Sequence, residues 1–199
     1  MEEHCRTSVE MSGRWRDAGI PDNYTISSLV FNPACQMLVA EVRGKDARLP
    51  KRLLLRHVTA DRYELIGEPD IDTAFRSPVT CEKLPVLLFN SWKLLRDAQG
   101  KRSGANWGGL YVFNLQSREM SICVSENNFN LPPPYDERGW ISEILDLSDD
   151  ACHAYVKVAL GRHEDDGERK IIRYDYHIAR LHLATRNLEL ISHLKNLFF

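Results

Sequence analysis

The chain has 199 residues, of which 43% are hydrophobic and 27% charged, a balance that is ordinary for a soluble globular protein. Its net charge of −2 argues against a general nucleic-acid or membrane-surface binder, because such proteins usually carry a strong basic excess. No apolar run approaches the roughly 20 residues that a membrane-spanning helix needs. The first residues also lack the apolar segment of a secretory signal, so we expect a cytoplasmic protein.

Residues 1–24 are polar, and the run Gly19-Ile20-Pro21-Asp22 would interrupt any helix among them. We predict an N-terminal arm over this stretch, either mobile or packed on the unit that follows it. The remainder, residues 25–199, is expected to form a single β domain.

Five cysteines occur at positions 5, 35, 81, 123 and 152, and no two of them form a C-x-x-C pair. Neither a disulfide scaffold nor a zinc ribbon is therefore indicated. Cys35, Cys81 and Cys152 each follow a predicted turn, where a small hydrophobic residue packs well. We expect reduced, mostly buried thiols, and we predict no metal site and no cofactor.

Three segments carry a hairpin signal, in which alternating apolar runs flank a short polar turn: Leu54–Ile66, Leu110–Ile122 and Ile178–Ile191. In each of them a polar residue ends the first run, namely His57, Asn114 or His182. A repeated polar side chain at a turn most often hydrogen-bonds to the local backbone, and we expect that role here.

Each hairpin follows a further pair of predicted strands. These pairs are Ile26–Phe31 with Met37–Val42, Thr73–Phe75 with Val86–Phe89, and Trp140–Leu145 with Ala154–Leu160. In the second pair the turn is placed at Ser77–Thr80, because Ser and Pro favour turns. The chain is therefore predicted to contain three four-stranded antiparallel blades, over about 26–69, 71–125 and 140–194.

Two of these segments resemble blades of the TolB-like and WD-repeat-like β-propellers. Ser148-Asp149-Asp150-Ala151 is similar to the Ser-Pro-Asp-Gly turn before their second strand, and Leu110-Tyr-Val-Phe-Asn-Leu115 is similar to their third strand. The resemblance covers about residues 26–194. It implies a propeller-like architecture and no particular activity.

Propellers typically close with about 4–8 blades, so three blades leave strands and blade faces uncovered. We expect an all-β protein in which two chains pair as a homodimer and complete a six-bladed ring. A half-ring completed by a different protein is one alternative. A β-sandwich or a small barrel is another, because short strands and turns permit both.

In such a blade the longer connections fall on one face. Here they are Gly44–Lys51, Ser91–Gly109, Glu126–Gly139 and Gly161–Lys170. Long loops on a rigid scaffold commonly carry binding sites. The candidate binding residues are the aromatic, cationic and amide side chains of these loops, namely Trp92, Lys93, Arg96, Arg102, Asn106, Trp107, Tyr135, Arg138 and His163. Tyr135 ends the run Leu131-Pro-Pro-Pro-Tyr135, which resembles ligands of WW domains but is expected to act as a stiff spacer.

No catalytic motif occurs, and no catalytic residue is assigned. The leading hypothesis is a non-catalytic protein-binding module, of the adaptor, inhibitor or immunity type, because Trp and Arg are favoured interface anchors. One alternative is a propeller hydrolase or lyase with a polar site in the central channel. A second is nucleic-acid binding through residues 91–109, whose aromatic and basic side chains could stack bases and neutralise phosphates.

Overall fold

The computed structural model describes residues 18–21, 23–46, 49–60, 62–67, 70–125, 128–165 and 170–193. Most of the predicted N-terminal arm, residues 1–17, lies outside the described residues. Over the described ranges the secondary structure is β-strand with no α-helix. None of the described segments is thus a helix long and apolar enough to cross a membrane.

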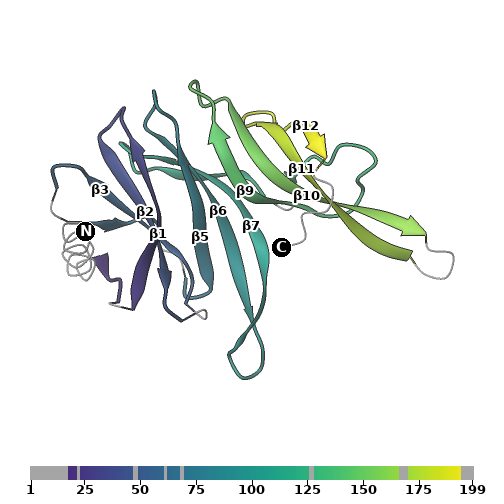
Figure 1. Cartoon of the computed structure of the whole chain (residues 1–199), viewed down its shortest axis with the longest axis horizontal. Helices are drawn as coiled ribbons and strands as arrows, with labels where there is room; N and C mark the ends of the chain where they lie inside the picture. Colours follow the sequence, from purple (N-terminus) through teal and green to yellow (C-terminus); the bar gives the residue numbers. More distant parts are fainter. Residues whose placement is uncertain are drawn as a thin grey trace, which may run out of the picture.

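The described strands form three four-stranded antiparallel sheets that lie side by side (Figure 1). The first sheet contains β1 (Tyr24–Asn32), β2 (Met37–Gly44), β3 (Arg52–His57) and β4 (Glu64–Leu65). The second contains β5 (Thr73–Thr80), β6 (Val86–Arg96), β7 (Arg102–Asn114) and β8 (Met120–Val124). The third contains β9 (Gly139–Leu147), β10 (His153–Asp165), β11 (Lys170–His182) and β12 (Leu188–His193).

Within each sheet the strands are neighbours in chain order, as the three predicted units require. The first strands of the sheets also contact one another, β1 with β5 and β5 with β9. This arrangement is consistent with propeller-like blades, and it places the start of each blade against the start of the next.

Two apolar cores hold the three sheets together. Side chains alternate between the two faces of a strand. Val39, Leu53 and Leu55 therefore share one face of the first sheet, where they pack in one cluster with Phe89 of the second sheet. A larger core joins the second and third sheets and includes residues such as Leu88. The blades are therefore stacked through side chains, while backbone pairing is confined to each blade.

The far face of the first sheet is covered by the chain itself. Ala40, Val42 and Leu54 on that face are fully buried in a cluster with Ile20 and Tyr24. The Tyr24 hydroxyl donates a hydrogen bond to the carbonyl of Pro50 at 3.1 Å. Tyr24 is the first residue of β1. The part of the predicted arm that the structure describes, around Ile20, therefore packs on the first blade.

The turn predicted at Ser77–Thr80 is wrong, because these residues belong to β5. The pairing of β5 with β6 shifts between Arg76 and Val79, and Ser77 has a φ of +56°. This is a β-bulge, in which an extra residue bends the strand without ending it. The chain reverses later, at residues 81–85.

Two of the predicted long loops are in fact strands. β6 and β7 pair out to Arg96 and Arg102, so most of Ser91–Gly109 is a β-hairpin. β10 and β11 likewise pair out to Asp165 and Lys170. Figure 1 shows both hairpins extending beyond the neighbouring strands. Lys93, Leu95 and Arg102 near one end, and His163 and Asp165 at the other, are exposed, so the apolar alternation of a buried strand is incomplete there.

The expected role of the polar turn residues is confirmed. The Asn114 carboxamide accepts hydrogen bonds from the backbone N–H groups of Gln116 and Ser117, both at 2.9 Å. His182 Nδ1 accepts one from the Thr185 N–H at 3.1 Å. His57 Nδ1 accepts one from the N–H two residues later, at 3.3 Å.

The described cysteines are all free thiols. Cys81 is buried, whereas Cys35 and Cys123 are half-buried. The expectation of buried thiols is wrong for Cys152, which lies in the connection between β9 and β10 and is exposed. Cys5 lies outside the described residues.

Candidate binding site

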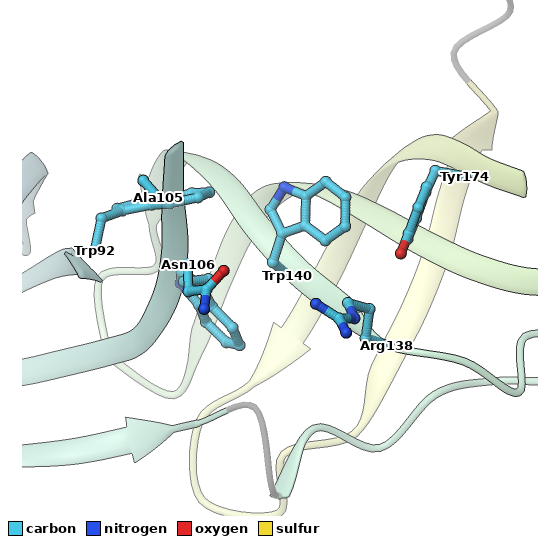
Figure 2. A pocket seen from close by; sticks show the side chains of 8 residues that line it. Trp92, Ala105, Asn106, Arg138, Trp140 and Tyr174 are labelled. Atoms are coloured by element: carbon cyan, nitrogen blue, oxygen red, sulfur yellow. The ribbon is translucent and has the colours of Figure 1, made fainter. Parts of the chain in front are cut away.

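A pocket of about 260 Å³ lies where the second and third sheets meet, and we name it the aromatic pocket (Figure 2). One wall comes from β6 and β7, and the other from the start of β9 and from β11. Its lining residues are Trp92, Ala105, Asn106, Trp107, Arg138, Gly139, Trp140 and Tyr174.

The wall on β7 is fixed by buried contacts of Trp107. The indole Nε1 donates a hydrogen bond to the Asn90 side-chain oxygen at 3.3 Å, and Asn90 itself is fully buried. The same ring meets Phe129 edge-on, with the centroids 5.6 Å apart. Because both partners are buried, this wall is preorganised before any ligand enters.

The opposite wall combines two aromatic rings with a cation. The ring centroids of Trp140 and Tyr174 are 4.8 Å apart. Figure 2 shows Arg138 beside Trp140 and Tyr174 on this side of the pocket. Within the described part of the chain, no carboxylate forms an ion pair with Arg138. The pocket therefore offers ring surface together with one guanidinium that is able to bind an anion.

Tyr135 and His163, two of the predicted binding residues, make contacts that hold the segment carrying Arg138. The Tyr135 hydroxyl lies 2.6 Å from His177 Nε2, and burial, followed by the nearby Asp175 carboxylate, raises the pKa of Tyr135. The His163 N–H donates to Asp136 Oδ1 at 3.0 Å. Neither residue lines the aromatic pocket.

Gly161 also holds this segment in place. Its N–H donates to the carbonyl of Arg138 at 3.0 Å. A Cβ at Gly161 would lie only 2.9 Å from that carbonyl oxygen and 2.9 Å from a ring carbon of Tyr174. A larger residue would therefore push this wall of the pocket outward.

A second pocket, of about 130 Å³, lies between the first and second sheets, and we name it the cationic pocket. It shares Trp92 and Ala105 with the aromatic pocket. Its lining residues are Leu49, Pro50, Lys51, Ala74, Arg76, Trp92, Leu94, Arg102 and Ala105.

Beside the cationic pocket, Glu41 is the centre of a buried network. Its carboxylate accepts hydrogen bonds from Lys51 Nζ, Ser27 Oγ and the Ser77 N–H, each at 2.6 Å. Burial alone would raise the pKa of Glu41, but these donors outweigh it and the pKa is lowered. The carboxylate is therefore held ionised although it is only 4% exposed.

Arg76 lies against the ring of Trp92, with its guanidinium carbon 4.2 Å from the ring centroid. Burial lowers the pKa of Arg76, and the nearby Arg102 lowers it further, against the attraction of Glu41. The guanidinium stays protonated at neutral pH because its intrinsic pKa is very high. A cation–π contact of this kind also orients the shared Trp92 ring.

The other two cationic candidates stabilise a connection between strands. Lys93 forms an ion pair with Asp70 at 2.9 Å, and Arg96 forms one with Asp72 at 2.5 Å. Both aspartates lie between β4 and β5. Lys93 and Arg96 line neither of the two pockets.

The structure thus brings together four predicted residues in the aromatic pocket, Trp92, Asn106, Trp107 and Arg138, and places Arg102 in the cationic pocket. The sequence reasoning missed Trp140, Tyr174, Lys51 and Arg76. Trp140 stood in a predicted strand, and Arg76 lay between a predicted strand and a predicted turn; no local pattern distinguished either from packing residues. No group of metal-binding side chains occurs within the described ranges.

Comparison with known proteins identifies no family. No protein-family description matches the sequence, and no curated protein matches it. One solved structure with similarity is a mannose phosphorylase from Leishmania mexicana in complex with a phosphate ion. It is 12% identical, the alignment covers 95% of this chain and 77% of that one, and the TM-score is 0.28. Similarity at this level carries no information about what this chain binds.

Proposed function

We propose that the protein is a non-catalytic binding module that receives an apolar or aromatic side chain of a protein partner in the aromatic pocket. The observation that carries this proposal is the composition of the pocket. Trp, Tyr and Arg are the residue types that dominate the energetic centres of protein interfaces, and here Trp107, Trp140, Tyr174 and Arg138 line a single pocket.

The size of the pocket supports the same partner class. At about 260 Å³ it lies below the range of roughly 300–1,000 Å³ that is usual for sites of drug-sized ligands. One large side chain fits this space better than a complete cofactor. The preorganised Trp107 wall also lowers the entropic cost of binding.

Peptides selected from a random phage-displayed library on the purified protein are expected to share an aromatic or long aliphatic residue. Trp140→Ala should weaken their binding at least about tenfold, because truncating a central anchor typically costs about 2 kcal/mol or more. Fluorescence anisotropy of labelled peptides measures the affinity.

The matched control is Tyr176→Ala, which removes an exposed ring of the same sheet that lies outside the pocket lining. It should leave affinity unchanged. A library that yields no enriched peptide, or peptides that bind the Trp140→Ala variant as tightly as the original protein, would contradict the proposal.

We also propose that a second copy covers the start of the blades and completes a ring. Phe31 on β1 and Leu145 on β9 are 44% and 43% exposed. Both line a cleft of about 500 Å³ that crosses β1, β5 and β9. The lining also includes Glu82, Asp146 and Asp149, so apolar and acidic side chains would face the second copy together. The segment around Ile20 already covers the far face of the first sheet, so the second copy would pack against that segment.

Light scattering is therefore expected to give a mass of twice 22.9 kDa. Leu145→Glu should shift the mass to that of one chain, since it would place a charge in the interface. Ile71→Glu, which places the same charge at a residue that is 73% exposed and outside the cleft lining, is the control. A single-chain mass for the unmodified protein would contradict ring closure by a second copy.

A further inference from the structure

The cationic pocket gathers more positive than negative charge. Lys51, Arg76 and Arg102 all line it. Lys51 is paired with the buried Glu41, whose charge also attracts Arg76. Glu143 attracts Arg76 as well, but more weakly than Arg102 repels it. Neither guanidinium forms an ion pair with a carboxylate of the described residues. Two guanidinium groups are thus held close together on the lining of one pocket.

Two side chains of this pocket each carry a buried donor that lacks an acceptor. Arg76 Nε and Trp92 Nε1 are both buried, and neither has a hydrogen-bond partner among the described residues. Both side chains line the pocket. A buried donor without an acceptor is costly, so a ligand that supplies acceptor oxygens relieves this cost as well as the charge repulsion.

The charge and the volume together indicate which ligand fits. Lys51, Arg76 and Arg102 outnumber the two nearby carboxylates, Glu41 and Glu143, so the pocket keeps a net positive charge that attracts an anion. A phosphate monoester carries about −1.5 to −2 charges near neutral pH and three strong acceptor oxygens. The pocket, at about 130 Å³, accommodates a group of that size but no nucleoside. Arginine forks also match the geometry of phosphate oxygens.

We propose that the cationic pocket binds a phosphate monoester group, with Arg76 and Arg102 as donors and Lys51 as a further positive charge. Trp92 orients Arg76 through their cation–π contact. The inference does not depend on peptide binding in the aromatic pocket, because Arg76 and Arg102 do not line that pocket and Trp140 does not line this one.

The test uses inorganic phosphate as the probe, with ³¹P line broadening measured at constant ionic strength. Broadening that saturates with protein concentration is expected. Arg102→Gln should weaken binding about tenfold or more, since hydrogen bonds to charged groups are worth roughly 1.5–3 kcal/mol. Arg102 is exposed, so this variant should fold normally. Arg76→Gln should weaken binding at least as much.

Lys93→Gln is the matched control. It removes one positive charge from the same hairpin, but Lys93 pairs with Asp70 and lies outside the pocket lining. Phosphate affinity should therefore be unchanged. Thermal unfolding gives a second readout, in which phosphate raises the Tm of the unmodified protein more than that of Arg102→Gln. The comparison between variants is needed because phosphate stabilises many proteins without binding to a site.

A capped phosphoserine amide distinguishes the two sources of the group. Binding of this compound supports a phosphorylated protein side chain as the source, whereas binding of inorganic phosphate alone supports a free phosphate compound. No saturable broadening, or equal affinity in the Arg102→Gln and Arg76→Gln variants, would overturn the proposal. Tighter binding of a single-stranded thymidine oligonucleotide than of phosphate would overturn it in favour of nucleic acid.

Discussion

Replacing Phe89 with alanine is expected to lower the free energy of unfolding by about 3–5 kcal/mol, the usual cost of removing a buried aromatic side chain. Phe89 on β6 is fully buried. Its ring lies 4.9 Å from that of Phe75 and stacks on Tyr111 at 5.6 Å, centroid to centroid. The cavity would open within the core that joins the first two blades, so their stacking should loosen.

Urea denaturation followed by circular dichroism measures this loss. Ile71→Ala is the control, because Ile71 is 73% exposed and its truncation should cost less than about 1 kcal/mol. If Phe89→Ala and Ile71→Ala destabilise the protein equally, then the core between the first two blades is not packed as described.

Glu41→Gln is expected to destabilise the protein by about 2–4 kcal/mol at pH 7, because it removes the charge that a partly buried Lys51 requires. The bonds from Ser27 and the Ser77 N–H would also lose their ionised acceptor. Ser77 lies in the bulge of β5, and its bond to Glu41 joins the second sheet to the first. Losing the ionised acceptor should therefore also weaken the contact between these two sheets.

The effect of Glu41→Gln should depend on pH. The pKa of Glu41 is lowered in the folded state, so its ionisation stabilises the fold above the ordinary value of 4.5. That stabilisation is lost as the pH falls below 4.5 through the lowered pKa. Urea titrations from pH 7 to pH 3 should therefore show the difference between the two proteins shrinking.

Glu189→Gln provides the control for this titration. Glu189 is exposed and pairs with Arg180 on the surface, where an ion pair contributes less than about 1 kcal/mol. A difference between Glu41→Gln and the unmodified protein that stays constant down to pH 3 would contradict the assigned role of the carboxylate.

The strand order within each blade was predictable because it depends on local pattern. The apolar alternation of Leu110–Ile122, for example, marks the hairpin of β7 and β8 directly in the sequence. The bulge at Ser77 was not predictable, since serine before proline is typical of a turn, and only pairing with β6 keeps this segment in a strand. The β6–β7 hairpin was missed because its end has no buried face to impose alternation.

The pockets were harder to predict than the strands. Trp92 and Trp107 lie opposite each other on paired strands, and the mixture of aromatic and basic residues around them marked this region in advance. Trp140 and Tyr174 come from another sheet, and their approach depends on how whole blades stack. Lys51 and Arg76 line one pocket from two different blades for the same reason. Contacts between sheets leave no periodic signature in the sequence.

Trp92 forms part of the wall of both pockets, so we expect occupancy of one to affect occupancy of the other. A ligand that fixes this indole in one orientation on one side also sets the shape of the space on the other. Thermodynamic linkage then requires that each ligand change the affinity of the other by the same factor. A single shared ring would make the molecule respond to two chemical signals jointly.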